Sequence, residues 1–216
     1  MNIKLNTGLL LLALLFSNHL VGQKTIPWNK FNALSRPEKA WVLSHPFVAK
    51  TTYLLSNYTL EAVRNLKFKN TIGQDEAGGK LDAFKHAFWM ALLSQKLNSK
   101  KARKLGMAHE KGNYQDFKKR KLEDNICSDK ASCEMDLWNN NVGIEIGSTN
   151  KSAKLEELEK LVIQAVLNGS LLIIKKDSSG NYLNSKGALI NIESFCKSWE
   201  NEKHLIKSNQ IDHVTP

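Results

Sequence analysis

Five polar side chains stand in segments with helical, largely apolar patterning, and their types suit acid–base or metal chemistry. Asp82 and His86 are four residues apart, as are Asp136 and Asn140, so each pair lies on one face of a helix. His109 falls on the inward stripe of a third helical segment. Because a buried carboxylate or imidazole without a partner is costly, these groups should meet one another or a ligand. We therefore predict one cluster of Asp82, His86, His109, Asp136 and Asn140.

A first hypothesis for this cluster is a metal-dependent hydrolase. Asp82, His86, His109 and Asp136 are ligand types that suit zinc or a similar divalent ion, and an open coordination position could activate water. Glu110, rotated about 100° from His109 around the helix, would act as general base if the helix end let it turn inward. The spacing alone does not prescribe a metal, because the chain has no His-Glu-x-x-His motif.

Two further hypotheses use the same residues without an ion. In metal-free acid–base catalysis, an Asp–His pair polarises a base, Asn139 or Asn140 donates to a developing anion, and Lys85 with Asn139 binds the ligand. The chain has no Gly-x-Ser-x-Gly motif and its cysteines are interpreted as structural, so no covalent nucleophile stands out. In the non-catalytic hypothesis, the polar cluster only stabilises the fold of a cell-envelope binding or structural module.

Three ordered motifs also carry a resemblance to a known family. They are Asp82-Ala83-Phe84-Lys85-His86-Ala87-Phe88-Trp89, Ala108-His109-Glu110, and MDLWNNNVG from Met135 to Gly143. Together they resemble a bacterial domain family of unknown function that occurs in secreted and toxin-associated proteins. The resemblance covers roughly residues 35–175. It implies that the three motifs belong to one domain, and it implies no activity.

The elements that must position these residues are predicted to be helices. Ser35-Arg36-Pro37-Glu38 is typical of a helix start, and that helix should end before His45-Pro46. Leu81 to Leu93 is apolar on nearly all sides, which predicts a buried helix. Further helices are expected from about 47, and over 59–66, 100–111, 135–147, 155–167 and 190–199, with a β-hairpin over about 171–183. The fold class is therefore mainly α: a compact multi-helix domain with a small C-terminal β-hairpin.

The expected core draws on most of these helices. It consists of Trp41, Leu54, Phe84, Phe88, Trp89, Leu92, Leu105, Trp138, Val142, Leu161 and Val162.

Residues 1–22 have the pattern of a secretory signal peptide, with Lys4, an apolar run from Leu9 to Phe16 and a small residue before Gln23. The run is shorter than the ~20 residues that span a bilayer, and no transmembrane helix is expected in the mature chain. Cleavage after Gly22 would remove 22 of the 216 residues. We expect an entry segment over 23–34, one helical domain over 35–199 and a loose tail over 200–216. The protein is therefore expected to be exported, either periplasmic or extracellular.

The positive charge suggests anionic partners without selecting one. The formal net charge is +10, and it falls to +9 when the signal peptide takes Lys4 with it. Anionic lipid or nucleic acid would suit the basic segment from Lys96 to Arg120, as would a phosphate-bearing substrate for a hydrolase. An ordinary solvated helix face explains the same pattern.

The three cysteines are interpreted as structural. Cys127 and Cys133 are close enough to close a small polar loop in an oxidising compartment, which predicts a disulfide between them. Cys196 would then be an unpaired, buried thiol.

Overall fold

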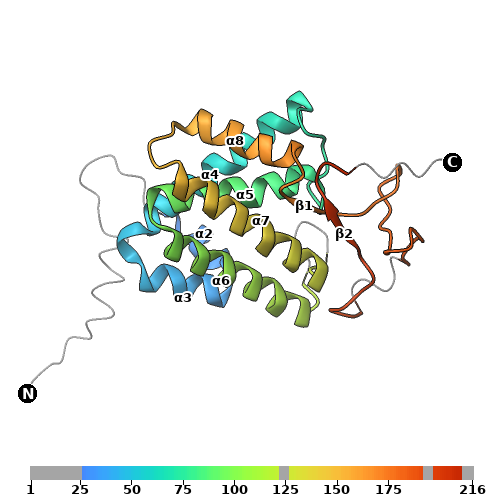
Figure 1. The fold of residues 1–216 in the computed structure, drawn as a ribbon. Helices are drawn as coiled ribbons and strands as arrows, with labels where there is room; N and C mark the ends of the chain where they lie inside the picture. Colours follow the sequence, from blue (N-terminus) through green and yellow to red (C-terminus); the bar gives the residue numbers. More distant parts are fainter. Residues whose placement is uncertain (1–25, 122–126, 192–196, 211–216) are drawn as a thin grey trace, which may run out of the picture.

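The computed structural model describes residues 26–121, 127–191 and 197–210. Within this part of the chain, seven helices precede a small antiparallel sheet, which lies at one side of the helical array (Figure 1). The predicted mainly α fold class is therefore confirmed. The predicted signal peptide lies outside the described residues.

The first three helices follow one another with short connections. They are α2 (Trp28–Ala33), α3 (Arg36–Ser44) and α4 (Pro46–Lys69). Ser35 caps α3 through a capping box with Glu38, in which each side chain meets the other residue's backbone N–H. The predicted break between 47 and 59 is absent, because no glycine or proline interrupts α4 after Pro46.

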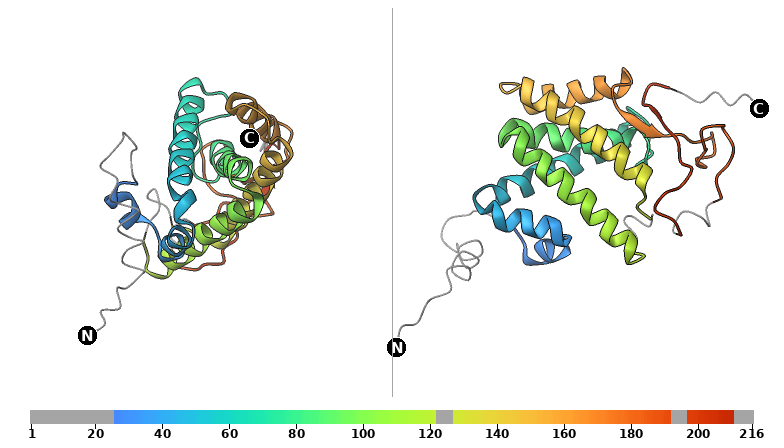
Figure 2. Two further views of the ribbon diagram at one scale, coloured as in Figure 1. Left: turned by 90° about the vertical axis from the view of Figure 1, so that its left-hand side faces the viewer. Right: turned by 60° about the horizontal axis from the view of Figure 1, so that its bottom comes forward.

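Helix α5 (Lys80–Lys96) forms the centre of the molecule, as its all-round apolar pattern predicts. Phe84, Phe88, Leu92 and Leu93 are fully buried. Figure 2 shows α5 enclosed by α4, α6 (Ser99–Lys118), α7 (Lys130–Thr149) and α8 (Leu155–Leu167), all of which contact it.

Helix α6 continues through Gly112, where a helix end was predicted. A Cβ at this glycine would lie 2.4 Å from Ser35 Oγ, so the glycine serves close packing of α6 on the start of α3.

Two glycines allow α5 and α7 to approach each other closely. A Cβ built at Gly143 would lie 2.0 Å from the carbonyl oxygen of Ala87, and one at Gly147 would lie 2.0 Å from that of Ala91. Both distances are far below van der Waals contact, so only glycine fits here. The face of α7 that carries these two glycines therefore packs directly against the backbone of α5.

The sheet differs from the predicted hairpin in its second strand. β1 (Leu172–Ile174) pairs antiparallel with β2 (Leu205–Lys207), which lies in the segment expected to be a loose tail. Across the turn after β1, Lys176 and Tyr182 form an isolated antiparallel bridge, and the Asp177 N–H donates to the Asn181 backbone oxygen at 3.0 Å. The second strand of the sheet was not predicted, because strand pairing depends on backbone hydrogen bonds between distant segments, which local patterning does not encode. Within the predicted helix 190–199, residues 192–196 lie outside the described residues, and residues 190, 191 and 197–199 are not helical.

Six of the eleven predicted core residues are buried, Trp89 and Val142 are partly buried, and the other three are exposed. Leu54, Trp138 and Leu161 are 47%, 52% and 39% exposed. Trp138 is instead at the surface of α7 and donates from Nε1 to the backbone oxygen of Ser170 at 3.0 Å.

Within the described residues, none of the helices is both long and apolar enough to span a bilayer.

Candidate functional site

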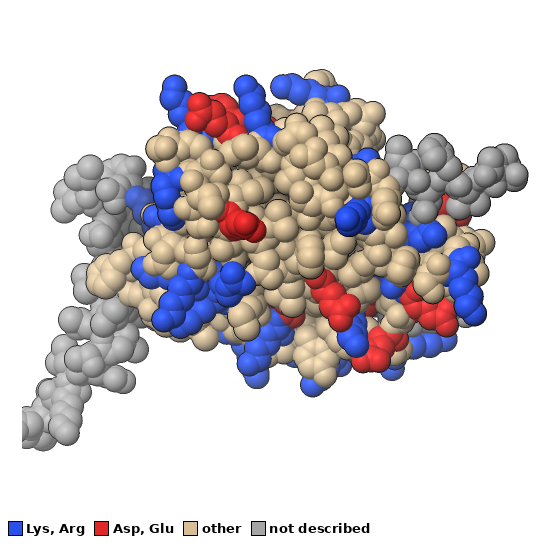
Figure 3. All heavy atoms as spheres, in the orientation of Figure 1, with Lys and Arg blue, Asp and Glu red and all other residues tan. Residues whose placement is uncertain are grey.

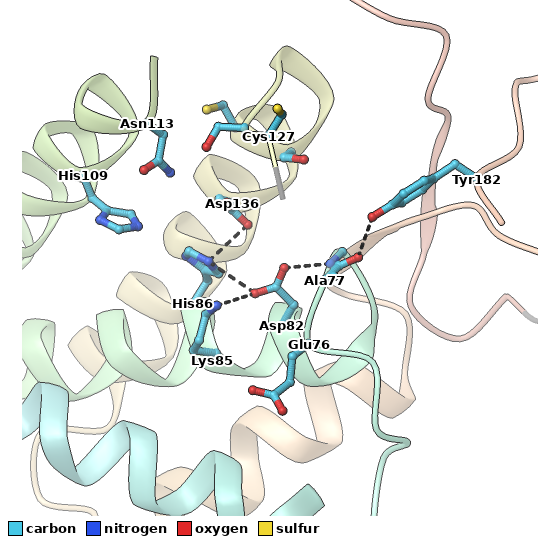
Figure 4. Close-up of a pocket in the computed structure, with 14 residues that line it drawn as sticks. Glu76, Ala77, Asp82, Lys85, His86, His109, Asn113, Cys127, Asp136 and Tyr182 are labelled. Atoms are coloured by element: carbon cyan, nitrogen blue, oxygen red, sulfur yellow. Dashed lines mark hydrogen bonds and ion pairs between the residues drawn. The ribbon is translucent and has the colours of Figure 1, made fainter. Parts of the chain in front are cut away.

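The first turns of α5 supply an aspartate, a lysine and a histidine to one point. Lys85 Nζ lies 2.7 Å from Asp82 Oδ1, and His86 Nε2 lies 3.6 Å from the same oxygen. The other carboxylate oxygen, Asp82 Oδ2, accepts a hydrogen bond of 2.8 Å from the backbone N–H of Gly78. The i, i+3 and i, i+4 spacings along the helix therefore set this arrangement, and the loop before α5 orients the carboxylate (Figure 4).

Helix α7 adds a second carboxylate from the opposite side of His86. Asp136 Oδ1 lies 3.3 Å from His86 Nε2, and the potential ligand atoms of Asp82, His86 and Asp136 all lie within 4.8 Å of one another. All three residues are buried. Three of the four predicted metal ligands thus form a compact cluster, and the close α5–α7 packing at Gly143 brings them together.

Burial sets the protonation state of His86. It lowers the pKa of the imidazole well below its usual value, and the nearby charge of Lys85 and the His109 ring lower this pKa further. Asn140, also predicted in the cluster, adjoins His86 and acts in the opposite direction. The net effect keeps His86 neutral near pH 7, which is the form that can accept a proton or bind a metal.

His109 reaches the same region from α6, but its closest acid is not in the predicted cluster. His109 Nδ1 lies 3.0 Å from Glu38 Oε1 of α3. The His109 ring centroid is 6.0 Å from that of His86, and its ring meets Trp89 edge-on at 5.8 Å. The two imidazoles are therefore neighbours, with His109 beside the three-residue cluster and tied to a different carboxylate.

Glu38 is the functional-site residue that sequence reasoning assigned only a helix-capping role. Burial tends to raise the pKa of its carboxyl, but the hydrogen bond and charge of His109, together with Ser35, lower this pKa overall. The capping box that holds Glu38 also fixes the direction of its second oxygen toward His109. The capping pattern could be read from the sequence, whereas the contact with His109, 71 residues away, could not.

Glu110 and Asn139 occupy positions unlike those expected. Glu110 is 6% exposed rather than rotated away from the interior, and it accepts a hydrogen bond of 3.1 Å from Asn113 Nδ2. Asn139 pairs with the backbone of Leu172 in both directions, donating at 3.0 Å and accepting at 2.9 Å. Its amide therefore anchors β1 to α7, and we reassign it from ligand binding to structure.

Two cavities meet beside His109. The smaller one, of about 70 Å³, is lined by the charged cluster and by residues of the surrounding loops, including Gly78, Ser128 and Tyr182. The larger one, of about 450 Å³, lies between α3, α4, α5 and α6. His109 and Asn113 line both cavities. Tyr182 comes from the C-terminal segment, which sequence analysis did not connect with the site.

The predicted disulfide between Cys127 and Cys133 is absent. Cys133 is a buried free thiol on α7. Burial raises the pKa of the Cys133 thiol well above its usual range, and the nearby carboxylate of Glu110 raises this pKa further. The thiol therefore stays protonated, which makes it unsuited to act as a nucleophile. Cys127 lines the smaller cavity, and Cys196 lies outside the described residues.

Several lysines of the predicted basic segment from Lys96 to Arg120 lie on the surface of α6. Figure 3 shows lysine and arginine side chains on one face of the molecule, several of them grouped at the lower left, with aspartate and glutamate side chains elsewhere on this face. Lys100, Lys104 and Lys111 are exposed. Lys85, on α5, is the lysine that lines the site itself.

Comparison with known protein families returned a match. The model of a family described as a domain of unknown function matches residues 39–170, a span that contains Asp82, His86, His109 and Asp136. No curated protein and no solved structure matches the chain.

Proposed function

The chain belongs to the family described as Domain of unknown function (DUF6973), and from the chemistry of its buried cluster we propose that it is a metal-dependent hydrolase. The observation that carries the proposal is the convergence of Asp82, His86 and Asp136, whose potential ligand atoms lie within 4.8 Å of one another. A polar group buried at this cost usually has a structural or a chemical use. The cluster lines a cavity, which favours the chemical use.

The cluster suits a divalent ion such as zinc. Metal–ligand bonds of about 2.0–2.2 Å in tetrahedral geometry hold ligand atoms roughly 3.3–3.6 Å apart. His86 Nε2 lies at 3.3 Å from Asp136 and at 3.6 Å from Asp82. Three protein ligands with a further open position are typical of catalytic zinc. The neutral state of His86 also fits, because a protonated imidazole cannot bind an ion.

The residues around the cluster supply positioning and proton transfer. An ion held there would supply Lewis acidity and lower the pKa of a bound water. We assign His109 the proton transfer, because Glu38 orients its ring at 3.0 Å and it lines the same cavity. In the reaction, water oxygen bonds to the electrophilic centre, the ester bond to the leaving oxygen breaks, and His109 passes the water proton to that oxygen.

We further propose a phosphate-bearing substrate. Lys85 supports this choice, because it is the cation nearest the cluster and is partly exposed in the smaller cavity. A cation beside the reacting group would stabilise the charge of a phosphoryl oxygen as the ester bond breaks. Anionic lipid and nucleic acid both carry such esters.

A second candidate, a purely structural polar network, is favoured by one observation. Asp82 already receives two contacts, from the Gly78 N–H at 2.8 Å and from Lys85 at 2.7 Å. A carboxylate satisfied in this way can stabilise the loop before α5 without any ligand. Under this candidate the protein would be a binding or structural module of the cell envelope.

Metal analysis of the full mature chain separates the two candidates. The protein is equilibrated with Zn²⁺, Mn²⁺ or Mg²⁺, its metal content is measured by mass spectrometry, and hydrolysis of bis(p-nitrophenyl) phosphate is followed. We expect one ion per chain and metal-dependent turnover, with at least a tenfold loss of both in Asp136→Asn. Glu145→Gln, an exposed carboxylate on the same helix, is the matched control and should change neither.

A chain that binds no ion and hydrolyses no ester, with a folding free energy reduced in Asp136→Asn, would establish the structural candidate. Turnover that survives a strong chelator would instead support metal-free acid–base catalysis by His86 and His109.

We propose that the protein is exported, because Lys4, the apolar run from Leu9 to Phe16 and the small residue Gly22 form the pattern of a secretory signal peptide. N-terminal sequencing of the protein recovered from the periplasm or medium of an expressing bacterium should begin at Gln23. Recovery of the full-length chain from the cytoplasm alone would contradict export.

A further inference from the structure

The larger cavity differs in chemistry from the smaller one that it adjoins. Its wall includes Leu34, Val42, Leu60, Trp89 and Leu105, contributed by four helices and the α2–α3 connection. Trp89 Nε1 already donates to Ser56 Oγ at 2.9 Å, so the polar atom of the indole is satisfied within the protein. A cavity of about 450 Å³ with such a wall is within the size range of ligand sites and suits a hydrocarbon body.

The candidate catalytic pair is part of the polar lining of this cavity. Glu38 and His109 line it, and His109 with Asn113 continues into the smaller cavity where Lys85 and the acidic cluster lie. A ligand that filled the apolar part would therefore present one end to His109. Leu60 of α4 also lines this cavity and is 48% exposed, so the cavity is accessible from the surface of α4.

We infer that this protein binds a single-chain amphiphile, with its hydrocarbon chain between α3, α4, α5 and α6 and its phosphate ester beside His109 and Lys85. The inference rests on the proposed function for the reaction, and it names the substrate class: a phosphate monoester or diester of a long-chain alcohol. Hydrolysis would transfer one water across the ester, giving an alcohol and a phosphate with one more hydroxyl. Apolar burial supplies the affinity, whereas the charged cavity supplies the position of the ester.

Calorimetric titration tests the chain-length requirement directly. Monododecyl phosphate, kept below its critical micelle concentration, is compared with butyl phosphate and with inorganic phosphate on the full mature chain. We expect dodecyl phosphate to bind at least tenfold more tightly than butyl phosphate. Equal affinity for all three would show that the site recognises phosphate alone, and would overturn the inference.

Two matched substitutions locate the bound chain. Leu60→Glu places a charge on the cavity wall and should weaken dodecyl phosphate binding at least tenfold, while inorganic phosphate binding stays unchanged. Leu167→Glu, at a residue 50% exposed on α8 and outside this cavity, should change neither. Both positions are half exposed, and circular dichroism would verify that both variants keep the helical content. An equal loss of dodecyl phosphate binding in both variants, or no loss in either, would overturn the inference.

The outcomes also separate this inference from the proposed function. Metal-dependent hydrolysis without a chain-length preference would leave the hydrolase standing and remove the amphiphile. Chain-dependent binding that Leu60→Glu abolishes, in a protein with neither metal nor turnover, would keep the amphiphile site and remove the hydrolase.

Discussion

Two buried polar clusters of this protein differ in how their charges are paired. Asp129 and Lys203 form an ion pair at 2.5 Å whose side chains are 0% and 1% exposed. Each has a further contact, since Asp129 accepts from the Ser132 N–H and Lys203 lies over the Tyr182 ring. The charges balance one to one. This pair closes the C-terminal segment onto the start of α7.

The Asp82–His86–Asp136 cluster is not balanced in this way. Asp82 and Asp136 both lie beside the neutral imidazole of His86, Asp82 also contacts Lys85, and the group borders a cavity. An ion pair with a purely structural role needs no opening to a cavity, whereas a site that acts on a ligand does. The contrast between the clusters supports the proposal of a chemical role for the second one.

Breaking the balanced pair should have the largest effect. Lys203→Met leaves Asp129 buried without its cation, and we expect a loss of about 3–5 kcal/mol in the free energy of unfolding. Urea denaturation followed by circular dichroism measures it. The double variant with Asp129→Asn keeps the helix cap and removes the charge, so it should recover most of the loss. A loss below about 1 kcal/mol would mean that the pair behaves like an exposed one.

The glycine that brings the unbalanced cluster together comes next. Gly143→Ala puts a methyl group 2.0 Å from the Ala87 carbonyl oxygen, one residue from His86, and should cost about 1–3 kcal/mol by forcing α5 and α7 apart. Gly106→Ala is the control, because its Cβ would be 3.1 Å from the Asn140 side chain, which can move. Equal unfolding midpoints for the two variants would show that the close approach does not set the site.

Neutralising one carboxylate of the unbalanced cluster should have a smaller effect of opposite sign. In the presence of a chelator, Asp136→Asn is expected to leave the free energy of unfolding unchanged or to raise it by up to about 1 kcal/mol, because two nearby carboxylates repel each other. Differential scanning calorimetry beside wild type measures this. A loss above about 2 kcal/mol would place Asp136 in the same structural class as Asp129.

Tyr182 lies beside Lys203 and lines the smaller cavity, so the ionisation of its phenol at alkaline pH should be sensitive to both clusters. Burial, with the charges of Asp75, Asp129 and Asp82, raises the pKa of its phenol to about 12. The folded state therefore holds the proton longer than the unfolded chain, and the stability due to Tyr182 is lost as pH rises from about 10 toward 12.

At pH 7, Tyr182→Phe should cost no more than about 1 kcal/mol, since the phenol donates one long hydrogen bond of 3.3 Å to the backbone oxygen of Ala77. The difference from wild type should shrink above pH 10 and reverse sign. Paired urea titrations measure the difference in the free energy of unfolding between the two proteins. If this difference does not change with pH, the phenol is solvated in the folded state.

Local pattern was sufficient for the helices whose faces are chemically distinct. The all-round apolar run of α5 predicted its burial, and the boundaries Leu155–Leu167 of α8 were predicted as they occur. The i, i+4 pair Asp82 and His86 was also predicted correctly as one stripe. These features follow from helical periodicity, which is a property of consecutive residues.

Features that depend on contacts between distant residues were missed or misassigned. Two of these features depend on a partner far along the chain: the pairing of β1 with β2 and the contact of Glu38 with His109. The third is Cys133, which is a free thiol where a disulfide with Cys127 was predicted. Asn139 shows the same limit, because its buried position was predicted but its backbone partner Leu172 was not.

By itself the sequence determined the buried character of α5 and the shared stripe of Asp82 and His86, since helical periodicity depends only on neighbours within two turns. Only the tertiary structure decided that Asp136 also meets His86 and that Glu38 meets His109. Helix crossings and two glycine contacts set these distances. Such distances are properties of packing between segments, and no local pattern specifies them.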